Sequence, residues 1–143
     1  MPLVLKIRCL RKGSKFPTYA YSGDAGLDLF AAERVILKKG ERKTVPTGIA
    51  VEIPKGHAGL LWDKSSVSLQ GGLKTIGGVI DAGYRGEIMV GFANISGKRV
   101  VIEKDQKVAQ MIIQKFESVK VREVARLSDS HRGGRAFGSS GKK

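Results

Sequence analysis

The stretch from Gly77 to Ile88 carries a carboxylate in a setting that could activate water. Its sequence, GGVIDAGYRGEI, places Asp81 between an apolar run and an Ala-Gly turn, with Tyr84 shortly after it. Apolar residues alternate again from Glu87, as in a returning strand, so we expect a β-hairpin with Asp81 at its tip. A carboxylate on such a turn can orient a water molecule and accept its proton. Alternatively, Asp81 satisfies only its own turn, as Asp commonly does.

Two more polar residues stand inside apolar segments. Asp28 lies between Leu27 and Leu29, and a strand there would turn its side chain to the opposite face from theirs. Gln110 is the polar exception in the apolar segment 107–116. Taken singly, Asp28 is typical of a solvent-facing strand residue and Gln110 of a satisfied core amide.

The elements that would position these residues are short strands. Alternating apolar residues and frequent turn signals predict strands within 4–10, 27–29, 35–37, 42–53, 58–62, 87–95, 99–102, 107–116 and 119–124. Pro46-Thr47-Gly48 predicts a bulge in the longest of them. Only residues 63–72 could form a short helical turn, with Asp63 as its N-cap. The pattern indicates an all-β sandwich or barrel.

The chain is long enough for one domain with a real core. After residue 127 the composition turns to Gly, Ser and basic residues, which predicts a flexible tail over 128–143. The single cysteine, Cys9, excludes an internal disulfide, and its alternating surroundings suggest a buried thiol. No apolar run approaches membrane-spanning length and the N-terminus does not resemble a signal peptide, so we expect a cytoplasmic protein with no membrane partner.

The formal net charge of +13 suggests a polyanionic partner, such as nucleic acid, a nucleotide or an acidic surface. The basic residues are scattered along the sequence without a dense block, and one Trp and three Tyr offer few rings for base stacking. Nucleic-acid binding is therefore left open but is not favoured over a small anionic substrate.

Five stretches resemble, in order, the five motifs of the homotrimeric deoxyuridine triphosphatase (dUTPase) family. The resemblance covers essentially the whole chain, because motifs, spacing and total length all agree. The matching stretches are Ala25–Leu29, Lys64–Ser66, Gly78–Gly86, Val108–Met111 and, in the tail, Arg132-Gly133 with Phe137–Gly141.

This resemblance implies a jelly-roll or distorted β-barrel with at most one short helix, assembled as a trimer whose active sites are shared between subunits. The implied activity is Mg²⁺-assisted hydrolysis of dUTP to dUMP and pyrophosphate by water attack on the α-phosphorus. Such an enzyme limits uracil incorporation into DNA and supplies dUMP for dTMP synthesis. It also implies a catalytic domain over 1–127 and a tail over 128–143 that closes over the substrate.

By position in the motifs, Asp81 matches the catalytic carboxylate and Tyr84 the ring that packs under deoxyribose. Asp28 matches the carboxylate that meets the metal through water. The backbone of 73–78 would read the uracil. The residues matched to substrate binding are Lys64, Ser65, Ser66, Gly78, Tyr84, Gln110, Arg132, Phe137, Gly138, Ser139 and Ser140.

Departures from the family pattern concern charge. Asp63-Lys64 replaces the usual Pro-Arg, and Lys cannot bind phosphate through the two-pronged fork that Arg offers. Arg135-Ala136 replaces glycines of the fifth motif, and Gly83 stands where a second acid is common.

The nearest alternative enzyme is a dCTP deaminase, which shares the fold and needs a carboxylate beside the pyrimidine. Glu87 is the candidate for this carboxylate, although its position in an alternating strand favours a structural role over a catalytic one. A non-catalytic nucleic-acid-binding protein on the same scaffold is the alternative from another class.

Overall fold

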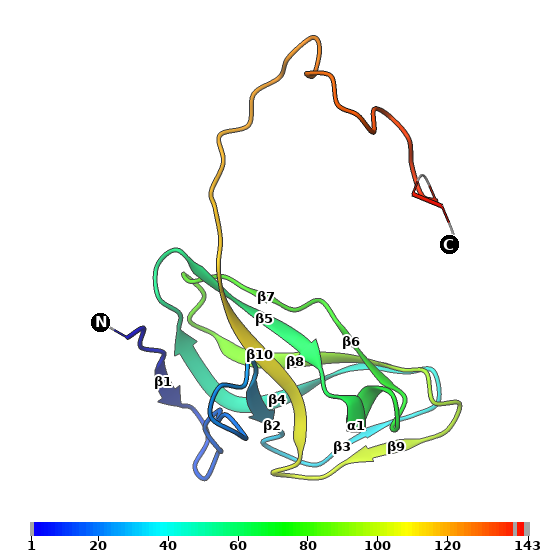
Figure 1. Ribbon diagram of the computed structural model, residues 1–143. Helices are drawn as coiled ribbons and strands as arrows, with labels where there is room; N and C mark the ends of the chain where they lie inside the picture. The colour runs from blue at the N-terminus through cyan, green and yellow to red at the C-terminus, as the bar shows by residue number, and fades with distance from the viewer. Residues whose placement is uncertain (1, 139, 142–143) are drawn as a thin grey trace.

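The computed structural model describes residues 2–138, 140 and 141. It contains strands and one short helix, as the sequence predicts (Figure 1). The elements, in chain order, are β1 (Lys6–Cys9), β2 (Leu27–Phe30), β3 (Val35–Leu37), β4 (Arg42–Glu52), β5 (His57–Asp63), α1 (Ser65–Ser68), β6 (Leu73–Ile76), β7 (Val79–Ile80), β8 (Glu87–Asn94), β9 (Val100–Ile102) and β10 (Lys107–Lys115).

The strands form two four-stranded sheets and a two-stranded ribbon, with antiparallel pairing throughout. The first sheet has the order β1-β4-β8-β6, the second the order β2-β10-β5-β7, and β3 pairs with β9. Side chains alternate between the two faces of each strand, and the apolar ones on the inner face form the core. In β8, Ile88, Val90 and Phe92 are buried, whereas Met89 between them is exposed.

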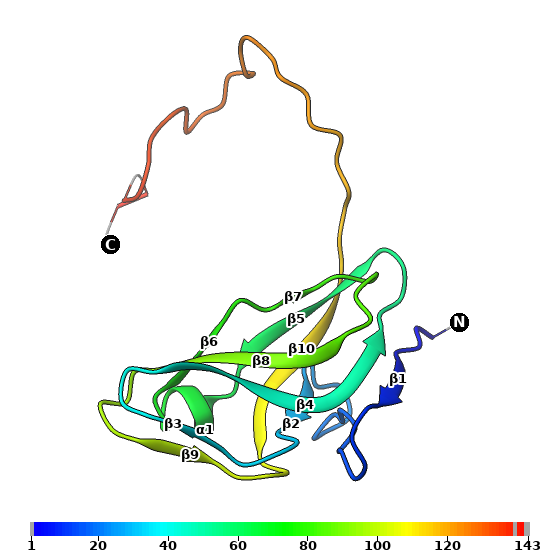
Figure 2. The same cartoon turned by 180° about the vertical axis from the view of Figure 1, so that it is seen from behind.

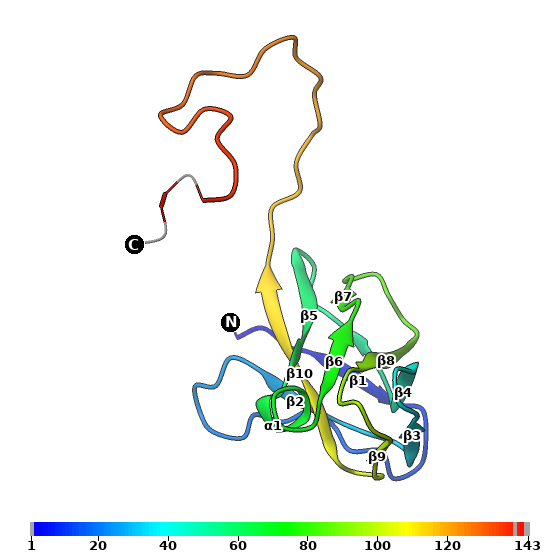
Figure 3. The ribbon, with the colours of Figure 1, turned by 90° about the vertical axis from the view of Figure 1, so that its right-hand side faces the viewer.

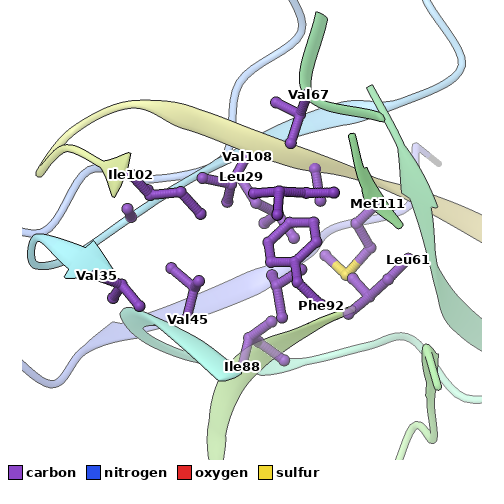
Figure 4. Close-up of a cluster of buried hydrophobic side chains, with 14 of the residues drawn as sticks. Leu29, Val35, Val45, Leu61, Val67, Ile88, Phe92, Ile102, Val108 and Met111 are labelled. Atoms are coloured by element: carbon purple, nitrogen blue, oxygen red, sulfur yellow. The ribbon is translucent and has the colours of Figure 1, made fainter. Parts of the chain in front are cut away.

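The core lies between the two sheets, with the ribbon at one end of it. Figure 4 shows the ring of Phe92 from the first sheet beside Leu29 and Met111 from the second. Phe92 is fully buried, and burial of such a ring contributes about 1.5–3 kcal/mol. This core fixes the relative position of the two sheets that carry the polar residues described below.

The predicted bulge in β4 is confirmed. The pairing of β4 with β8 shifts register between Pro46 and Ala50. Inside the bulge the buried Thr47 hydroxyl donates to the Ile88 carbonyl at 2.7 Å. The Gly48 N–H donates to the Glu87 carboxylate at 2.8 Å, so the bulge also holds the start of β8.

The expected hairpin around Asp81 is wrong in its pairing. β7 pairs with β5, not with β8, and β8 pairs instead with β6 and β4. Between β6 and β7 the chain passes from the first sheet to the second through Gly77 and Gly78, whose φ angles are +74° and +125°. Sequence alternation identifies strands but not their partners, and two adjacent glycines allow the change of sheet.

Two smaller expectations are also wrong. Cys9 is exposed, and its thiol donates to the Arg11 carbonyl at 3.0 Å. Its strand, β1, lies at the edge of the first sheet and is mostly exposed. Residues 119–124 form no strand, because beyond Phe116 the chain extends away from the body without a neighbouring strand (Figure 3). The boundary at residue 127 stays a prediction.

No helix among the described residues is long and apolar enough to cross a membrane.

We predict that Thr47→Val lowers the free energy of unfolding by about 1–3 kcal/mol, because the buried Ile88 carbonyl loses its donor. Chemical denaturation measures this value. Thr44→Val, the same change at an exposed position of β4, should stay within about 0.5 kcal/mol of wild type. Equal stability of the two variants would contradict a buried hydrogen bond in the bulge.

Candidate active site

Asp81 lies on a tight turn directly after β7. Ile80, its predecessor, pairs with Gly59 on β5, and the Tyr84 N–H closes the turn on the Asp81 carbonyl at 3.1 Å. The Asp81 side chain is exposed. It borders a pocket of about 230 Å³ that is also lined by Val79, Ile80, Tyr84, Glu87 and Met89. A free carboxylate thus stands at the edge of a partly apolar pocket, where it can bind a water molecule.

Tyr84 is held in one orientation beside this carboxylate. Its hydroxyl donates to the Glu87 carbonyl at 2.8 Å. A Cβ on Gly86 would lie 2.5 Å from the Tyr84 hydroxyl oxygen, so a side chain at position 86 would displace the tyrosine from this position. The ring is therefore a fixed wall of the pocket.

Gly78 places the backbone of the arm against β5. Its carbonyl accepts the Leu61 N–H at 2.8 Å. A Cβ at this position would stand 3.1 Å from the Leu61 carbonyl oxygen, and the φ of +125° disfavours any other residue. A second hollow of about 230 Å³ lies between β5, β6 and β7. Its lining includes Thr75 and the two glycines Gly77 and Gly78, which have no side chains to cover their backbone.

Asp28 is buried, which corrects the expectation of a solvent-facing residue. It is 2% exposed, and two lysines reach it from neighbouring segments. Lys64 Nζ donates to Oδ1 at 2.5 Å. Lys107 Nζ lies 3.1 Å from Oδ2, close enough for an ion pair but poorly aligned for a hydrogen bond.

Burial raises the pKa of Asp28, but the ammonium groups of Lys64 and Lys107 outweigh it and hold that pKa below its ordinary value. The carboxylate is therefore ionised at neutral pH and already balanced by two cations. Among the described residues there is no group of three metal-ligating side chains. Because both Asp28 oxygens face ammonium groups, the residues present do not fit a magnesium ion held by the protein alone.

Gln110 is placed by β10, the strand between β2 and β5. It stands opposite Asp28 on one side and Trp62 on the other. Its Nε2 donates to the Asp63 carbonyl at 2.9 Å. A Cβ on Gly26 would lie 2.2 Å from its Oε1, so the glycine of the first motif makes room for this amide.

The helix α1 presents Ser65 and Ser66 with exposed side chains, while Val67 anchors it in the core. The first N–H groups of a helix have no partners within the helix. Hydroxyl and N–H donors beside the ammonium of Lys64 suit an anionic group. The expected cap is wrong, because the N-cap residue is Lys64 and no side chain caps the helix.

The carboxylate of Asp63 turns instead to β6. It accepts the Thr75 N–H at 2.8 Å and pairs with the Lys74 ammonium. Burial raises the pKa of Asp63, but the hydrogen bonds from Lys74 and Thr75 together lower it by more. The pKa of Asp63 therefore lies below its ordinary value. The negative charge that replaces the proline of the second motif is thus neutralised by Lys74.

The site residues fall into two groups within one chain. Asp81 and Tyr84 follow β7 at one edge of the second sheet, and Asp28 lies on β2 at the other edge. Asp28 aligns with Trp62 across β10, whereas Asp81 follows the residue paired with Gly59. The two carboxylates are therefore three strand spacings apart across the sheet and about four residues apart along the strands. Together these displacements separate them by on the order of 20 Å. Lys64, Ser65, Ser66 and Gln110 belong to the Asp28 group.

The described residues of the tail contact neither group. It leaves the body after β10 and loops through open space (Figure 1). Arg132 donates to the carbonyls of Arg135 and Ala136, and Phe137 is fully exposed. Gly138 and Ser140 lie in the same turn region, and Ser139 lies outside the described residues.

Sequence reasoning missed Lys107, Lys74 and Thr75, which bind the two partly or fully buried carboxylates. Each comes from a different strand than its partner. Strand pairing places Lys107 near Asp28, and the packing of the two sheets places Lys74 and Thr75 near Asp63. No local sequence signal carries either arrangement.

Comparison with known proteins gives a consistent picture. The dUTPase family model matches residues 12–141. The deoxyuridine 5'-triphosphate nucleotidohydrolase of Clostridium kluyveri is 41% identical over 139 residues, covering 96% of this chain and 97% of that protein. That of Thermobifida fusca is 43% identical over 140 residues, 96% of this chain and 78% of its own length.

Solved structures agree. The dUTPase of Staphylococcus bacteriophage 80alpha with dUPNHPP superposes with a TM-score of 0.91 at 31% identity, covering 97% of this chain and 99% of that one. A mutant dUTPase from phage phi11 of S. aureus, described with a structural Mg(II) ion, has a TM-score of 0.79 at 29% identity, covering 86% of this chain and 97% of its own.

We predict that Lys74→Ala raises the pKa of Asp63 toward its ordinary value, because the carboxylate loses its ammonium partner. A carboxyl NMR titration measures this directly. In wild type the lowered pKa means that Asp63 contributes stability above the unfolded-state value, and this is lost as pH falls through the folded-state value.

Lys12→Ala, which removes an exposed lysine in the β1–β2 loop, is the matched control and should leave the Asp63 pKa unchanged. An Asp63 titration that is identical in wild type and Lys74→Ala would contradict the ion pair.

Proposed function

The chain belongs to the dUTPase family, and we propose that it hydrolyses dUTP to dUMP and pyrophosphate. The proposal rests on a family match over almost the whole chain and on the retained motif residues. The observation that carries its chemistry is an exposed Asp81 on a fixed turn, beside a ring whose position is locked.

Asp81 would act as the general base. Its carboxylate would orient a water molecule and take its proton as the water oxygen attacks the α-phosphorus. The bond between that phosphorus and the α,β-bridging oxygen breaks, and pyrophosphate leaves with the bonding electrons. Phosphoryl chemistry of this kind depends mainly on positioning and charge stabilisation, so the base would act together with the phosphate contacts described below.

Tyr84 would select deoxyribose. A ring fixed by the Glu87 carbonyl and by contact with Gly86 cannot retreat from an added 2′-hydroxyl. The uracil would meet the backbone of the β6–β7 arm around Thr75 and Gly78, where the chain crosses between sheets. Extended backbone offers a donor and acceptor pattern like that of a base edge.

The phosphates would bind at the second group, through the hydroxyls of Ser65 and Ser66 and through Gln110. Lys64 is committed to Asp28 at 2.5 Å, so it would contribute its charge from there rather than as a two-pronged ligand. With Asp63 neutralised by Lys74, no uncompensated negative charge opposes the triphosphate.

The separation of the two groups supports active sites shared between subunits. About 20 Å between Asp28 and Asp81 is too far for one nucleotide to reach both within a chain. A homotrimer that brings Asp81 and Tyr84 of one subunit to the Asp28 group of another would complete each site. The isolated chain thus carries two half-sites.

Magnesium would enter as part of the substrate, bound to the triphosphate oxygens. Mg²⁺ commonly keeps several waters and binds mainly through substrate phosphates. Asp28, the predicted metal contact through water, would meet that hydration shell rather than the ion. The cytoplasmic location predicted from the sequence stays a prediction.

The tail would supply the last contacts. Arg132 carries a cation for phosphate, Phe137 an exposed ring for the uracil, and Gly138, Ser139 and Ser140 donors for phosphate oxygens. A segment that reaches so far from its own body can close over a site on a neighbouring subunit.

A dCTP deaminase is less favoured because Glu87 is occupied. Its carboxylate accepts the Gly48 N–H at 2.8 Å and pairs with Arg11 at 3.3 Å. A carboxylate engaged in holding the β4 bulge is poorly placed to act as an acid or base on a pyrimidine, although the residue lines the same pocket.

We predict that wild type, supplied with Mg²⁺, releases pyrophosphate from dUTP but not from UTP, dCTP or dTTP, and that Asp81→Asn removes this turnover. Loss of the base should lower kcat by about 10²–10⁴-fold while nucleotide binding persists. A pyrophosphate-release assay and calorimetric binding of a non-hydrolysable dUTP analogue give the two readings.

Gly83→Asn, a change in the same exposed turn with no Cβ contact, is the control and should retain turnover. Near wild-type turnover in Asp81→Asn would contradict the catalytic assignment, and ammonia released from dCTP would identify a deaminase instead.

Truncation after Leu127 should leave the body folded, because the tail residues that the structure describes make no contact with it. It should lower kcat/KM severely because the closing segment is removed. Circular dichroism and steady-state kinetics separate the two effects. A truncated protein with full activity would rule out a closing tail.

A further inference from the structure

The fold gathers basic residues that are scattered along the sequence. Pairing of Leu37 on β3 with Val100 on β9 places the turn after β3 beside the turn before β9. Both turns lie together at the right in Figure 1 and at the left in the reverse view of Figure 2. Their exposed cations, called the basic end here, are Lys38, Lys39, Arg42, Lys43, Lys98 and Arg99.

A buried side chain locks the two turns together. Asn94 is 2% exposed, and its Nδ2 lies within donating distance of the carbonyls of Leu37, Lys38 and Lys98 at 3.1, 3.0 and 2.8 Å. Its Oδ1 accepts from Ser96. The cations are therefore mounted on a fixed base, which lowers the entropy cost of binding a ligand to several at once.

The charge of the basic end is largely uncompensated. Glu41 is the one acid within residues 38–43 and 96–99, and it binds the Lys38 N–H and pairs with Lys43 at 3.8 Å. The other five cations form no ion pair among the described residues. Six positive charges on the two turns and the adjoining first residues of β4 thus oppose a single negative one.

No residue assigned to the proposed reaction belongs to this surface, although α1 with Ser65 and Ser66 adjoins it, since the Ile95 N–H donates to the Gly72 carbonyl at 2.9 Å. β8 runs from Glu87, just beyond the Asp81 turn, to Asn94 beneath the basic end, and a strand of this length spans about 25 Å. The two turns expose only one large apolar side chain, Ile95, and no aromatic ring. A protein partner would require an apolar patch at the centre of its interface, and base stacking would require rings.

We propose that the basic end binds the phosphate backbone of nucleic acid without sequence preference. Several fixed cations with neither apolar nor aromatic neighbours suit a linear array of phosphates, whose binding is driven by counterion release. The proposal accounts for the +13 charge, which the hydrolysis of a single nucleotide does not require. It is independent of the proposed activity.

The test is fluorescence anisotropy of a labelled duplex of about 20 base pairs with the full chain, over about 50 to 200 mM salt. We expect wild type to bind, with affinity falling steeply as salt rises. Lys39→Gln with Arg99→Gln should lower the affinity about tenfold or more. It should also reduce the slope of log affinity against log salt by about 2, one for each phosphate that is no longer neutralised.

Lys12→Gln with Lys55→Gln is the matched control. It removes the same charge from two exposed lysines outside the basic end. Lys55 lies beyond the other end of β4 from Arg42, and Lys12 lies beside the β4 bulge, next to Arg11, whose N–H donates to the Gly48 carbonyl at 3.2 Å. It should keep the wild-type slope to within about half a unit. The kinetic constants for dUTP should be unchanged in both double variants.

Four results would overturn the proposal. The first is no measurable duplex binding at the lowest salt, and the second is equally weakened duplex binding in the two double variants. The third is a KM for dUTP that rises in Lys39→Gln/Arg99→Gln but not in the control. The fourth is that Lys39→Gln/Arg99→Gln binds anionic lipid vesicles more weakly than wild type while it retains duplex binding. The second result would mean that the charge acts diffusely, the third that it serves the nucleotide, and the fourth that its ligand is a membrane surface.

Discussion

The change of sheet at Gly77 and Gly78 is the constraint on which the site depends. β6 belongs to the first sheet and β7 to the second, so the arm between them ties together the two layers of the core. Both glycines have positive φ, and a side chain at Gly78 would press on the Leu61 carbonyl. Because the arm crosses here, Thr75, Gly77 and Gly78 line a hollow between β5, β6 and β7, and the Asp81 turn is carried to the edge of the second sheet.

A second recurring feature is the neutralisation of carboxylates by lysines from other strands. Asp28 meets Lys64 and Lys107, and Asp63 meets Lys74. Both carboxylates stand close to the donors proposed for phosphate. Unpaired, they would repel a triphosphate in a region of low effective dielectric. Paired, they are neutralised, and the Asp28–Lys64 pair also ties β2 to the start of α1. Replacement of Pro-Arg by Asp-Lys in the second motif is therefore tolerable only together with Lys74.

The sequence was sufficient for what depends on local pattern. Strand positions, the β4 bulge and the single helical turn follow from alternation and turn residues. Strand partnership does not, which explains the wrong pairing expected around Asp81, whereas the strand expected over 119–124 is absent because that segment leaves the body. Asp28 was expected to face solvent because alternation ignores what covers a strand end. Asp63 was expected to cap α1 because Thr75 and Lys74 are close to it only through the fold. The roles of Asp81 and Tyr84 came from joint occurrence of motifs, since each residue alone has a local explanation.

Assembly links the two proposals. In the proposed trimer, Asp81 and Asp28 at opposite edges of one sheet would serve different sites, so activity would require association, which the like charge of +13 per chain opposes. Association must therefore come from apolar surface, and exposed Trp62, Val79 and Met89 near the arm are suited to it. In a trimer the basic end occurs three times. A long polyanion that reaches two copies would be held far more tightly than by one, because the second contact forms at high effective concentration. Weak phosphate binding by a single basic end would then become substantial only in the assembly that also completes the active sites.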